Sequence, residues 1–184
     1  MSDVVKPSLK ILIASDHAGF ELKKRLIQDL PQWSWEDLGP QSTEKLDYPD
    51  AAAQVARRIS SGQAQQGILI CGTGIGMSIA ANKFPHIRAA LAHDLNSARL
   101  SREHNDANIL CLGARLLSAQ DGVEIVRVWL TTAFSGESRH ADRIKKIEAL
   151  EEKWTTAKDS SGDQTSPVPS DKNSNPNPTR RARS

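Results

Sequence analysis

Short runs that indicate strands recur along the chain, at residues 10–15, 33–38, 67–71, 88–93 and 108–113, and the first and third are strongly apolar. Between and after these runs, apolar residues return at helical spacing over residues 20–30, 49–62, 77–83, 96–103 and 118–134. Strands that alternate with helices in this way predict a parallel sheet with helices on both faces. We therefore expect an α/β fold, a Rossmann-like three-layer α/β/α sandwich around a five-stranded parallel sheet.

An amphipathic segment follows the alternating part of the chain. Residues 137–154 carry apolar side chains on one helical stripe, formed by Ile144, Ile147, Leu150 and Trp154. No strand follows that would hold this extra C-terminal helix against the sheet. We expect the helix to pack across a second copy of the chain, while packing on its own domain would give the same pattern.

The length of the chain, 184 residues, predicts one folded domain. We place this domain at residues 9–155, after a short N-terminal extension at residues 1–8. Over residues 156–184, Ser, Pro, Asn, Asp and Gly dominate, so this low-complexity tail is expected to be disordered.

The charge of the chain is nearly balanced, with 24 Lys and Arg against 22 Asp and Glu. The tail holds five of these basic and three of these acidic residues, so the folded part is neutral and we expect no nucleic-acid partner.

No apolar stretch reaches the ~18 residues of a membrane span, and none at the N-terminus resembles a signal peptide. The two cysteines lie in strand-like runs, which does not indicate a disulfide framework. We expect a cytoplasmic protein without membrane contact.

The third apolar run ends at a thiol and a glycine-rich turn, Cys71-Gly72-Thr73-Gly74-Ile75-Gly76. A strand that passes into a helix through such a turn lies at the carboxyl edge of the sheet, where α/β proteins bind ligands. Glycines at alternate positions leave the backbone N–H groups open to an anion, and the following helix adds its positive end. The same field favours the thiolate form of Cys71. Tight turns also use glycine for geometry alone, so the turn by itself leaves both interpretations open.

A nucleotide-binding module is one alternative use of this turn. The dinucleotide fingerprint requires a glycine where Met77 stands, and the Lys-Ser/Thr pair of the P-loop is missing. Asp94, however, ends the next strand about where a ribose-binding acid would lie.

Further candidates lie at both edges of the expected sheet. Asp16 and His17 follow the first strand and therefore share the carboxyl edge with Cys71. His104 and Asn105 precede the fifth strand and lie at the opposite edge, so their participation requires a neighbouring chain.

Three arginines are candidates for binding a phosphate. Arg139 and Arg143 are four residues apart on the last helix and project from one face, where they could clamp one phosphate or pair with the nearby acids Glu137 and Asp142. Arg115 is the third candidate. His86, His93 and His140 are interpreted as solvated or structural, and no spacing of Cys and His predicts a zinc site.

A thiolate base, an anion-binding turn, a histidine acid and paired arginines together suit proton transfer beside a carbonyl on a phosphorylated substrate. Aldose–ketose isomerisation fits this set. A non-catalytic sugar-phosphate or nucleotide-binding module is a competing class, and a metal-dependent hydride-shift isomerase is a third.

The motifs that carry these residues resemble the ribose-5-phosphate isomerase B family, which also includes galactose-6-phosphate and allose-6-phosphate isomerases. The resemblance covers roughly residues 9–152 and rests on four segments: Asp16-His17-Ala18-Gly19-Phe20, Asp47-Tyr48-Pro49, Gly67 through Lys83, and Ser101-Arg102-Glu103-His104-Asn105-Asp106. It does not include the tail.

The resemblance implies an intramolecular oxidoreductase that interconverts D-ribose 5-phosphate and D-ribulose 5-phosphate through a cis-enediolate, without metal or organic cofactor. It implies that Cys71 accepts the proton from C2 and that His104, from the partner subunit, opens the furanose ring. The substrate-binding residues implied are Asp16, His17, Tyr48, Gly72, Thr73, Gly74, Ile75, Gly76, Asn105, Arg115, Arg139 and Arg143. The partners implied are a small-molecule sugar phosphate and a second copy of the chain, in a homodimer or dimer of dimers with shared sites. Allose 6-phosphate and galactose 6-phosphate are alternative substrates.

Overall fold

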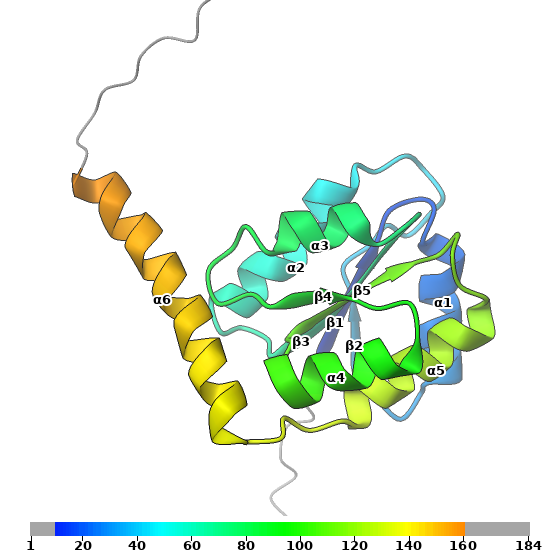
Figure 1. Cartoon of the computed structure of the whole chain (residues 1–184). Coiled ribbons are helices and arrows are strands. Elements are labelled where there is room, and N and C mark those ends of the chain that lie inside the picture. The colour runs from blue at the N-terminus through cyan, green and yellow to red at the C-terminus, as the bar shows by residue number, and fades with distance from the viewer. Residues whose placement is uncertain (1–9, 161–184) are drawn as a thin grey trace, which may run out of the picture.

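The computed structural model of the chain describes residues 10–160 (Figure 1). Five parallel strands form one sheet in the order β2-β1-β3-β5-β4. Their bounds are Ile11–Ser15 for β1, Trp35–Asp37 for β2, Gln66–Cys71 for β3, Ala89–Leu91 for β4 and Ile109–Gly113 for β5. The expected five-stranded parallel sheet is confirmed, and β4 is an edge strand.

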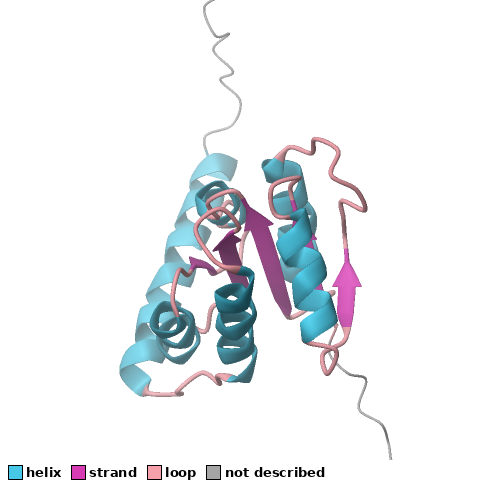
Figure 2. Ribbon diagram, turned by 90° about the vertical axis from the view of Figure 1, so that its right-hand side faces the viewer, coloured by secondary structure: helices cyan, strands magenta, loops and turns pink. Residues whose placement is uncertain are grey.

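Helices cover both faces of the sheet, which confirms the expected three-layer sandwich (Figures 1 and 2). Helices α1, α4 and α5 pack on one face, and their bounds are Phe20–Asp29, Leu95–Asn105 and Ala119–Thr131. Helices α2 (Tyr48–Ser60) and α3 (Ile75–Ala81) pack on the other. Successive strand residues point to opposite faces, so β1 buries Ile13 under α1 and α5, and Leu12 under α2. Burial on both faces explains why β1, β3 and β5 are apolar runs, while the edge strands β2 and β4 are half-buried.

The helix boundaries follow local signals in the sequence. Ser118 precedes α5, and its hydroxyl accepts a hydrogen bond from the Asp121 N–H at 3.1 Å, as expected for a helix cap. Helix α3 begins at Ile75, two residues before the expected start at Met77, because Gly74 takes a left-handed conformation that turns the chain directly into the helix.

Helix α6 (Ser138–Ser160) packs against the end of α4 and then passes the segment before β4, where Glu148 pairs with Arg88 at 3.8 Å and Glu151 accepts the His86 N–H at 2.8 Å (Figure 1). Of the three stripe residues whose side chains the structure describes, Ile144 is 8% exposed, while Ile147 and Leu150 are 40% and 58% exposed. The helix continues beyond the expected end at Trp154 and includes residues 156–160, which the composition had assigned to the tail. The expectations for residues 1–8 and 161–184 lie outside the described residues.

A buried lysine anchors the segment between β2 and α2. The Lys23 side chain is fully buried, and its ammonium donates to Asp37 Oδ1 and to the carbonyl of Pro40, both at 2.6 Å. Its positive charge is therefore paired, as burial of a lysine requires. This contact fixes the start of the loop that leads to Tyr48.

The connections after β1 and β3 diverge at the carboxyl edge of the sheet. From β1 the chain passes to α1 on one face, and from its neighbour β3 the chain passes to α3 on the other. Such a switch point opens a crevice between the two loops, and this is where open α/β sheets bind their ligands.

Candidate active site

A cavity of about 430 Å³ opens at this switch point. Its lining comes from the ends of β1, β3 and β5 and from the starts of α2 and α3, and consists of Asp16, Tyr48, Cys71, Gly72, Thr73, Ile75, Gly76, Ile79 and Arg115. The structure therefore brings together eight of the residues expected at the site. Ile79, which is 58% exposed, is an addition to that set.

The thiol of Cys71 lies at the floor of the cavity. Its side chain is 5% exposed, and its sulfur accepts a hydrogen bond from the Gly74 N–H at 3.1 Å. Gly74 has φ +77° and precedes the first turn of α3, and this conformation aims its N–H back at the sulfur. This hydrogen bond fixes the position of the Cys71 sulfur at the floor of the cavity.

Tyr48 forms a wall of the cavity directly against the backbone of α3. A Cβ added at Gly76 would lie 2.5 Å from the Tyr48 ring, so only glycine permits this approach. The Tyr48 side chain is 41% exposed and faces the open side of the cavity.

Arg115 supplies positive charge beside the glycine turn. The Arg115 N–H donates to the Gly72 carbonyl at 3.0 Å, and the guanidinium atoms lie 3.3 Å from the position of a Cβ on Gly72. The Arg115 side chain has no hydrogen bond or ion pair with any residue in the described part of the chain. The guanidinium is thus available for an anionic group of a ligand.

Asp16 is held in place by the turn that follows β1. Its Oδ1 accepts the N–H groups of Ala18 and Gly19 at 2.9 and 3.0 Å, and the residue is 7% exposed. The carboxylate is therefore oriented at the cavity wall before any ligand binds. His17 is exposed and does not line the cavity.

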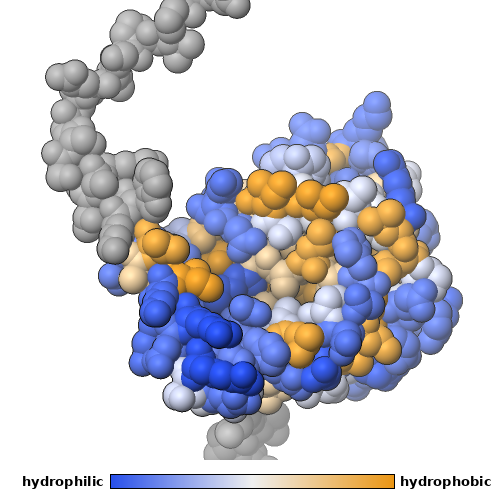
Figure 3. Space-filling model, viewed as in Figure 1, coloured by the Kyte–Doolittle hydropathy of each residue, from blue (hydrophilic) through white to orange (hydrophobic). Residues whose placement is uncertain are grey.

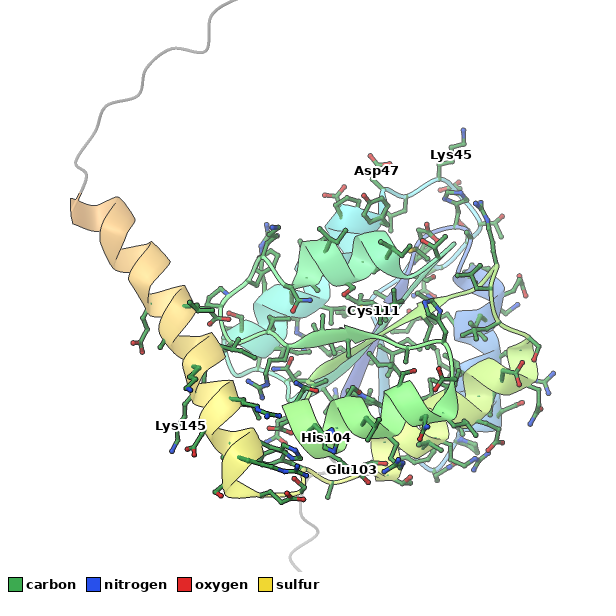
Figure 4. All side chains as sticks on the ribbon, viewed as in Figure 1. Lys45, Asp47, Glu103, His104, Cys111 and Lys145 are labelled. Carbon is green, nitrogen blue, oxygen red and sulfur yellow. The ribbon has the colours of Figure 1, made fainter. Side chains whose placement is uncertain are left out.

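The remaining expected residues, His104, Asn105, Arg139 and Arg143, lie at the amino edge of the sheet. This is the edge at which β3 and β5 begin. The two starts lie side by side, since the Gly67 N–H in β3 donates to the carbonyl of Asn108, the residue before β5. From Gly67 to Cys71 the strand rises about 13 Å. Figure 4 shows His104 at the end of α4 beside α6, far from Asp47 next to the cavity. Within one chain the structure does not bring the two groups together.

The two arginines of α6 differ in their partners. Arg139 Nε pairs with Glu137 Oε2 at 2.7 Å, which lowers the pKa of the Glu137 carboxyl, chiefly through this hydrogen bond. Asp142 pairs with Lys145 instead of Arg143. The Arg143 side chain has no hydrogen bond or ion pair among residues 10–160. Of the expected surface ion pairs of these arginines, the pair of Arg139 with Glu137 therefore forms, and a pair of Arg143 with Asp142 does not.

Arginine contacts that the sequence did not reveal hold the end of α4. Asp106, with φ +44°, accepts hydrogen bonds from Arg102 Nη1 at 2.7 Å and from Arg88 Nη2 at 3.2 Å. The Asn105 carbonyl accepts a further bond from Arg88 Nε at 3.0 Å. Residues 104–106 are thus fixed although they end a helix, where chains usually fray.

Asp94 does not line the cavity at the switch point. It precedes α4, and its Oδ1 accepts the Ser97 N–H at 2.7 Å, so it acts as a helix cap. The pKa of this carboxyl is lowered, chiefly by that hydrogen bond. The cap accounts for the placement of Asp94, and the residue contributes nothing to the lining of the cavity at the switch point.

Of the other histidines, His86 and His93 are exposed and His140 is buried. Within residues 10–160, no group of three or more His, Cys, Asp and Glu side chains is arranged to hold a metal ion. No helix in the described part of the chain has the length and apolar character needed to cross a membrane.

The chain matches known proteins over its folded part. A family model described as Ribose/Galactose Isomerase matches residues 11–147. Ribose-5-phosphate isomerase B of Escherichia coli is 44% identical over 146 residues, which cover 78% of this chain and 97% of that protein. The structure of Clostridium thermocellum ribose-5-phosphate isomerase B has a TM-score of 0.76 at 47% identity, covering 79% of this chain and 99% of that one. Ribose-5-phosphate isomerase B of Mycoplasma genitalium, solved with bound ribulose-5-phosphate, has a TM-score of 0.75 at 42% identity, with 79% and 97% covered.

Proposed function

Because the chain belongs to the ribose/galactose isomerase family, we propose that it interconverts D-ribose 5-phosphate and D-ribulose 5-phosphate. The observation that carries this proposal is the Cys71 sulfur, which accepts the Gly74 N–H inside a cavity that Arg115 also lines. A similar protein at 42% identity is described with ribulose-5-phosphate bound. The substrate is thus a small sugar phosphate.

The isomerisation proceeds by proton transfer through a cis-enediolate. The Cys71 thiolate removes the proton from C2 of open-chain ribose 5-phosphate, and the electron pair moves onto the C1 oxygen. Backbone N–H groups of Gly72 to Gly76 donate hydrogen bonds to the enediolate oxygens, where negative charge develops. A proton passes from the C2 hydroxyl to the C1 oxygen within the enediolate, so that the negative charge lies on the C2 oxygen. The thiol then returns its proton to C1, which leaves a hydroxyl at C1 and a carbonyl at C2. Asp16 and Tyr48 of this cavity contact the sugar, with His17 beside the cavity and Asn105 of the partner subunit completing the set.

The second half of the site comes from another copy of the chain. His104 opens the furanose ring as a general acid, and it lies at the wrong edge of the sheet to reach the Cys71 cavity of its own chain. A homodimer supplies the missing group if the partner's His104 faces this cavity. Arg115 of one chain and Arg139 and Arg143 of the other then bind the phosphate end.

An exposed apolar surface supports this assembly. Apolar side chains gather around the edge strand β4 on the face seen in Figure 3, and lie over α3 and beside α6. They include Ile75, Ile79, Leu95, Ile147 and Leu150, each at least 40% exposed. Apolar clusters of this kind are typical of protein interfaces.

The proposal is tested with purified protein and ribose 5-phosphate in EDTA. We expect ribulose 5-phosphate to form, the Cys71→Ala variant to be nearly inactive, and solvent deuterium to enter C1 of the product. The Cys111→Ala variant is the matched thiol control, because Cys111 is buried on the same face of the sheet but does not line the cavity. Full activity of Cys71→Ala would exclude the assigned base, and product without solvent deuterium would favour a hydride shift.

The name of the matching family includes galactose as well as ribose, so substrate choice needs its own measurement. The values of kcat/KM for ribose 5-phosphate, allose 6-phosphate and galactose 6-phosphate are to be compared. We expect ribose 5-phosphate to have the highest value.

A further inference from the structure

A buried histidine lies directly behind His104. His140 is 2% exposed, although its neighbours Arg139 and Ala141 on α6 are exposed or half-buried. The centroid of its ring lies 4.2 Å from that of His104, with the two planes tilted by 44°. No step of the proposed reaction uses His140.

His140 is itself fixed in place. Its Nδ1 shares a hydrogen bond with the Ser135 hydroxyl at 2.9 Å, and its backbone N–H donates to the Glu137 carbonyl at 2.9 Å. A ring bonded at Nδ1 and buried on both faces cannot turn over without breaking that bond. The two contacts therefore hold the His140 imidazole in one orientation.

The loop that carries Ser135 is fastened to the helix that carries His104. The Ser135 N–H donates to the carbonyl of Glu103 at 3.1 Å, and Arg102 Nε donates to the carbonyl of Thr132 at 3.3 Å. Ser135, His140 and His104 thus form one rigid group that joins the end of α4 to the start of α6.

We propose that His140, held by Ser135, is a positioning residue for His104 in the ring-opening step. This inference rests on the proposed function. The tilted ring contact sets the rotamer of the His104 imidazole and leaves its outer edge free to face the ring oxygen of a sugar bound to the partner subunit. A general acid needs a nitrogen within hydrogen-bond reach of that oxygen, and a displacement of about 1 Å can cost roughly 100-fold in rate.

The contact between the two histidines is ring packing and not a hydrogen bond. His140 therefore orients His104 and does not pass a proton to it. The charged side chains near this group are Glu137, which precedes α6, Arg139 on α6, and Arg102 and Glu103 on α4.

Two assays separate positioning of His104 from general damage to the fold. The first measures conversion of ribose 5-phosphate, which is mostly cyclic, in a single turnover with enzyme in excess over sugar. The second measures exchange of the C1 protons of ribulose 5-phosphate with D2O, which needs Cys71 and an open chain but no ring opening.

The variants are chosen to remove one contact at a time. Ser135→Ala removes the hydroxyl bound to Nδ1, and His140→Phe keeps a ring against His104 but loses that nitrogen. Ser138→Ala is the matched control, because Ser138 is exposed on the same segment. All are compared with His104→Ala and with the unchanged chain.

We expect Ser135→Ala and His140→Phe to slow single-turnover conversion by about 10-fold, while C1 exchange changes by less than about twofold. The double variant should lose no more than either single variant, because both act through one hydrogen bond. Equal losses in the two assays, or no loss in conversion, would overturn the inference. If the unchanged chain exchanges C1 protons but does not open the ring faster than the uncatalysed rate, the inference fails while the proposed function stands. Absence of both activities would remove the proposed function itself.

Discussion

Replacement of Gly74 by alanine tests the geometry of the thiol turn. Gly74 has φ +77° and ψ −18°, a left-handed conformation that costs a residue with a Cβ about 1–2 kcal/mol. The added Cβ would also lie 2.5 Å from Leu91 Cδ1 and 2.9 Å from the Leu112 carbonyl carbon. The Leu91 side chain can move, but the Leu112 backbone belongs to the central strand β5 and cannot.

The expected cost of this substitution has two parts. The backbone conformation contributes about 1–2 kcal/mol to the loss of stability, and overpacking adds about 1–3 kcal/mol. If the turn shifts to relieve the overpacking, the Gly74 N–H moves away from the Cys71 sulfur. A hydrogen bond to a charged group is worth about 1.5–3 kcal/mol, so kcat/KM should fall by roughly 10- to 100-fold.

Gly62 provides the matched control for the backbone part. It has φ +75°, and a Cβ added there would meet nothing within 4 Å. Gly62→Ala should therefore show the cost of the left-handed conformation alone and keep full activity. Both variants are measured by urea unfolding at one fixed protein concentration and by initial rates with ribose 5-phosphate. Equal stability of the two variants with unchanged activity of Gly74→Ala would refute the assigned turn geometry.

Three further predictions concern charged groups. Lys23→Met should lower the free energy of unfolding by about 3 kcal/mol, because it leaves the carboxylate partner of a buried ion pair uncompensated. Lys24→Met is the control at an exposed site, and a comparable loss of stability in that variant would contradict the prediction. Arg115→Met should raise KM for ribose 5-phosphate by roughly 10- to 100-fold through loss of a charge-assisted bond to phosphate, and an unchanged KM would place the phosphate elsewhere. The lowered pKa of Asp94 implies a stabilisation that is present above the unfolded carboxyl pKa of about 3.9 and is lost as the pH falls through the folded value. The Tm difference between the unchanged chain and Asp94→Ala, caused by loss of the bond to the Ser97 N–H, should accordingly be larger at pH 7 than at pH 3, and equal differences would argue against the cap.

Much of the fold follows from local patterns. Apolar runs mark the three interior strands β1, β3 and β5, because strands buried on both faces have no polar side to display. The place of Cys71 after β3 and of His104 before β5 also predicts that they lie at opposite edges of a parallel sheet, which the structure confirms. The positions of Cys71 and His104 relative to their strands were sufficient to predict these opposite edges, because the prediction depends on no contact between side chains.

The details that depend on distant contacts were not accessible in the same way. Nothing in the sequence near Tyr48 indicates that its ring lies on Gly76, because that contact depends on how α2 packs beside α3. For His140 a signal did exist. It precedes Ile144 by four residues and so continues the apolar stripe of the last helix, which marks it as a buried residue instead of a solvated one.

Mixing of two inactive variants tests the shared site most directly. Chains with Cys71→Ala and chains with His104→Ala are combined by refolding together, and the conversion of ribose 5-phosphate is measured. In a homodimer with sites built from both chains, half of the dimers are mixed and each mixed dimer holds one intact site, so about a quarter of the unchanged activity should return. Activity no higher than the mean of the two separate variants would contradict a site composed of Cys71 from one chain and His104 from its partner.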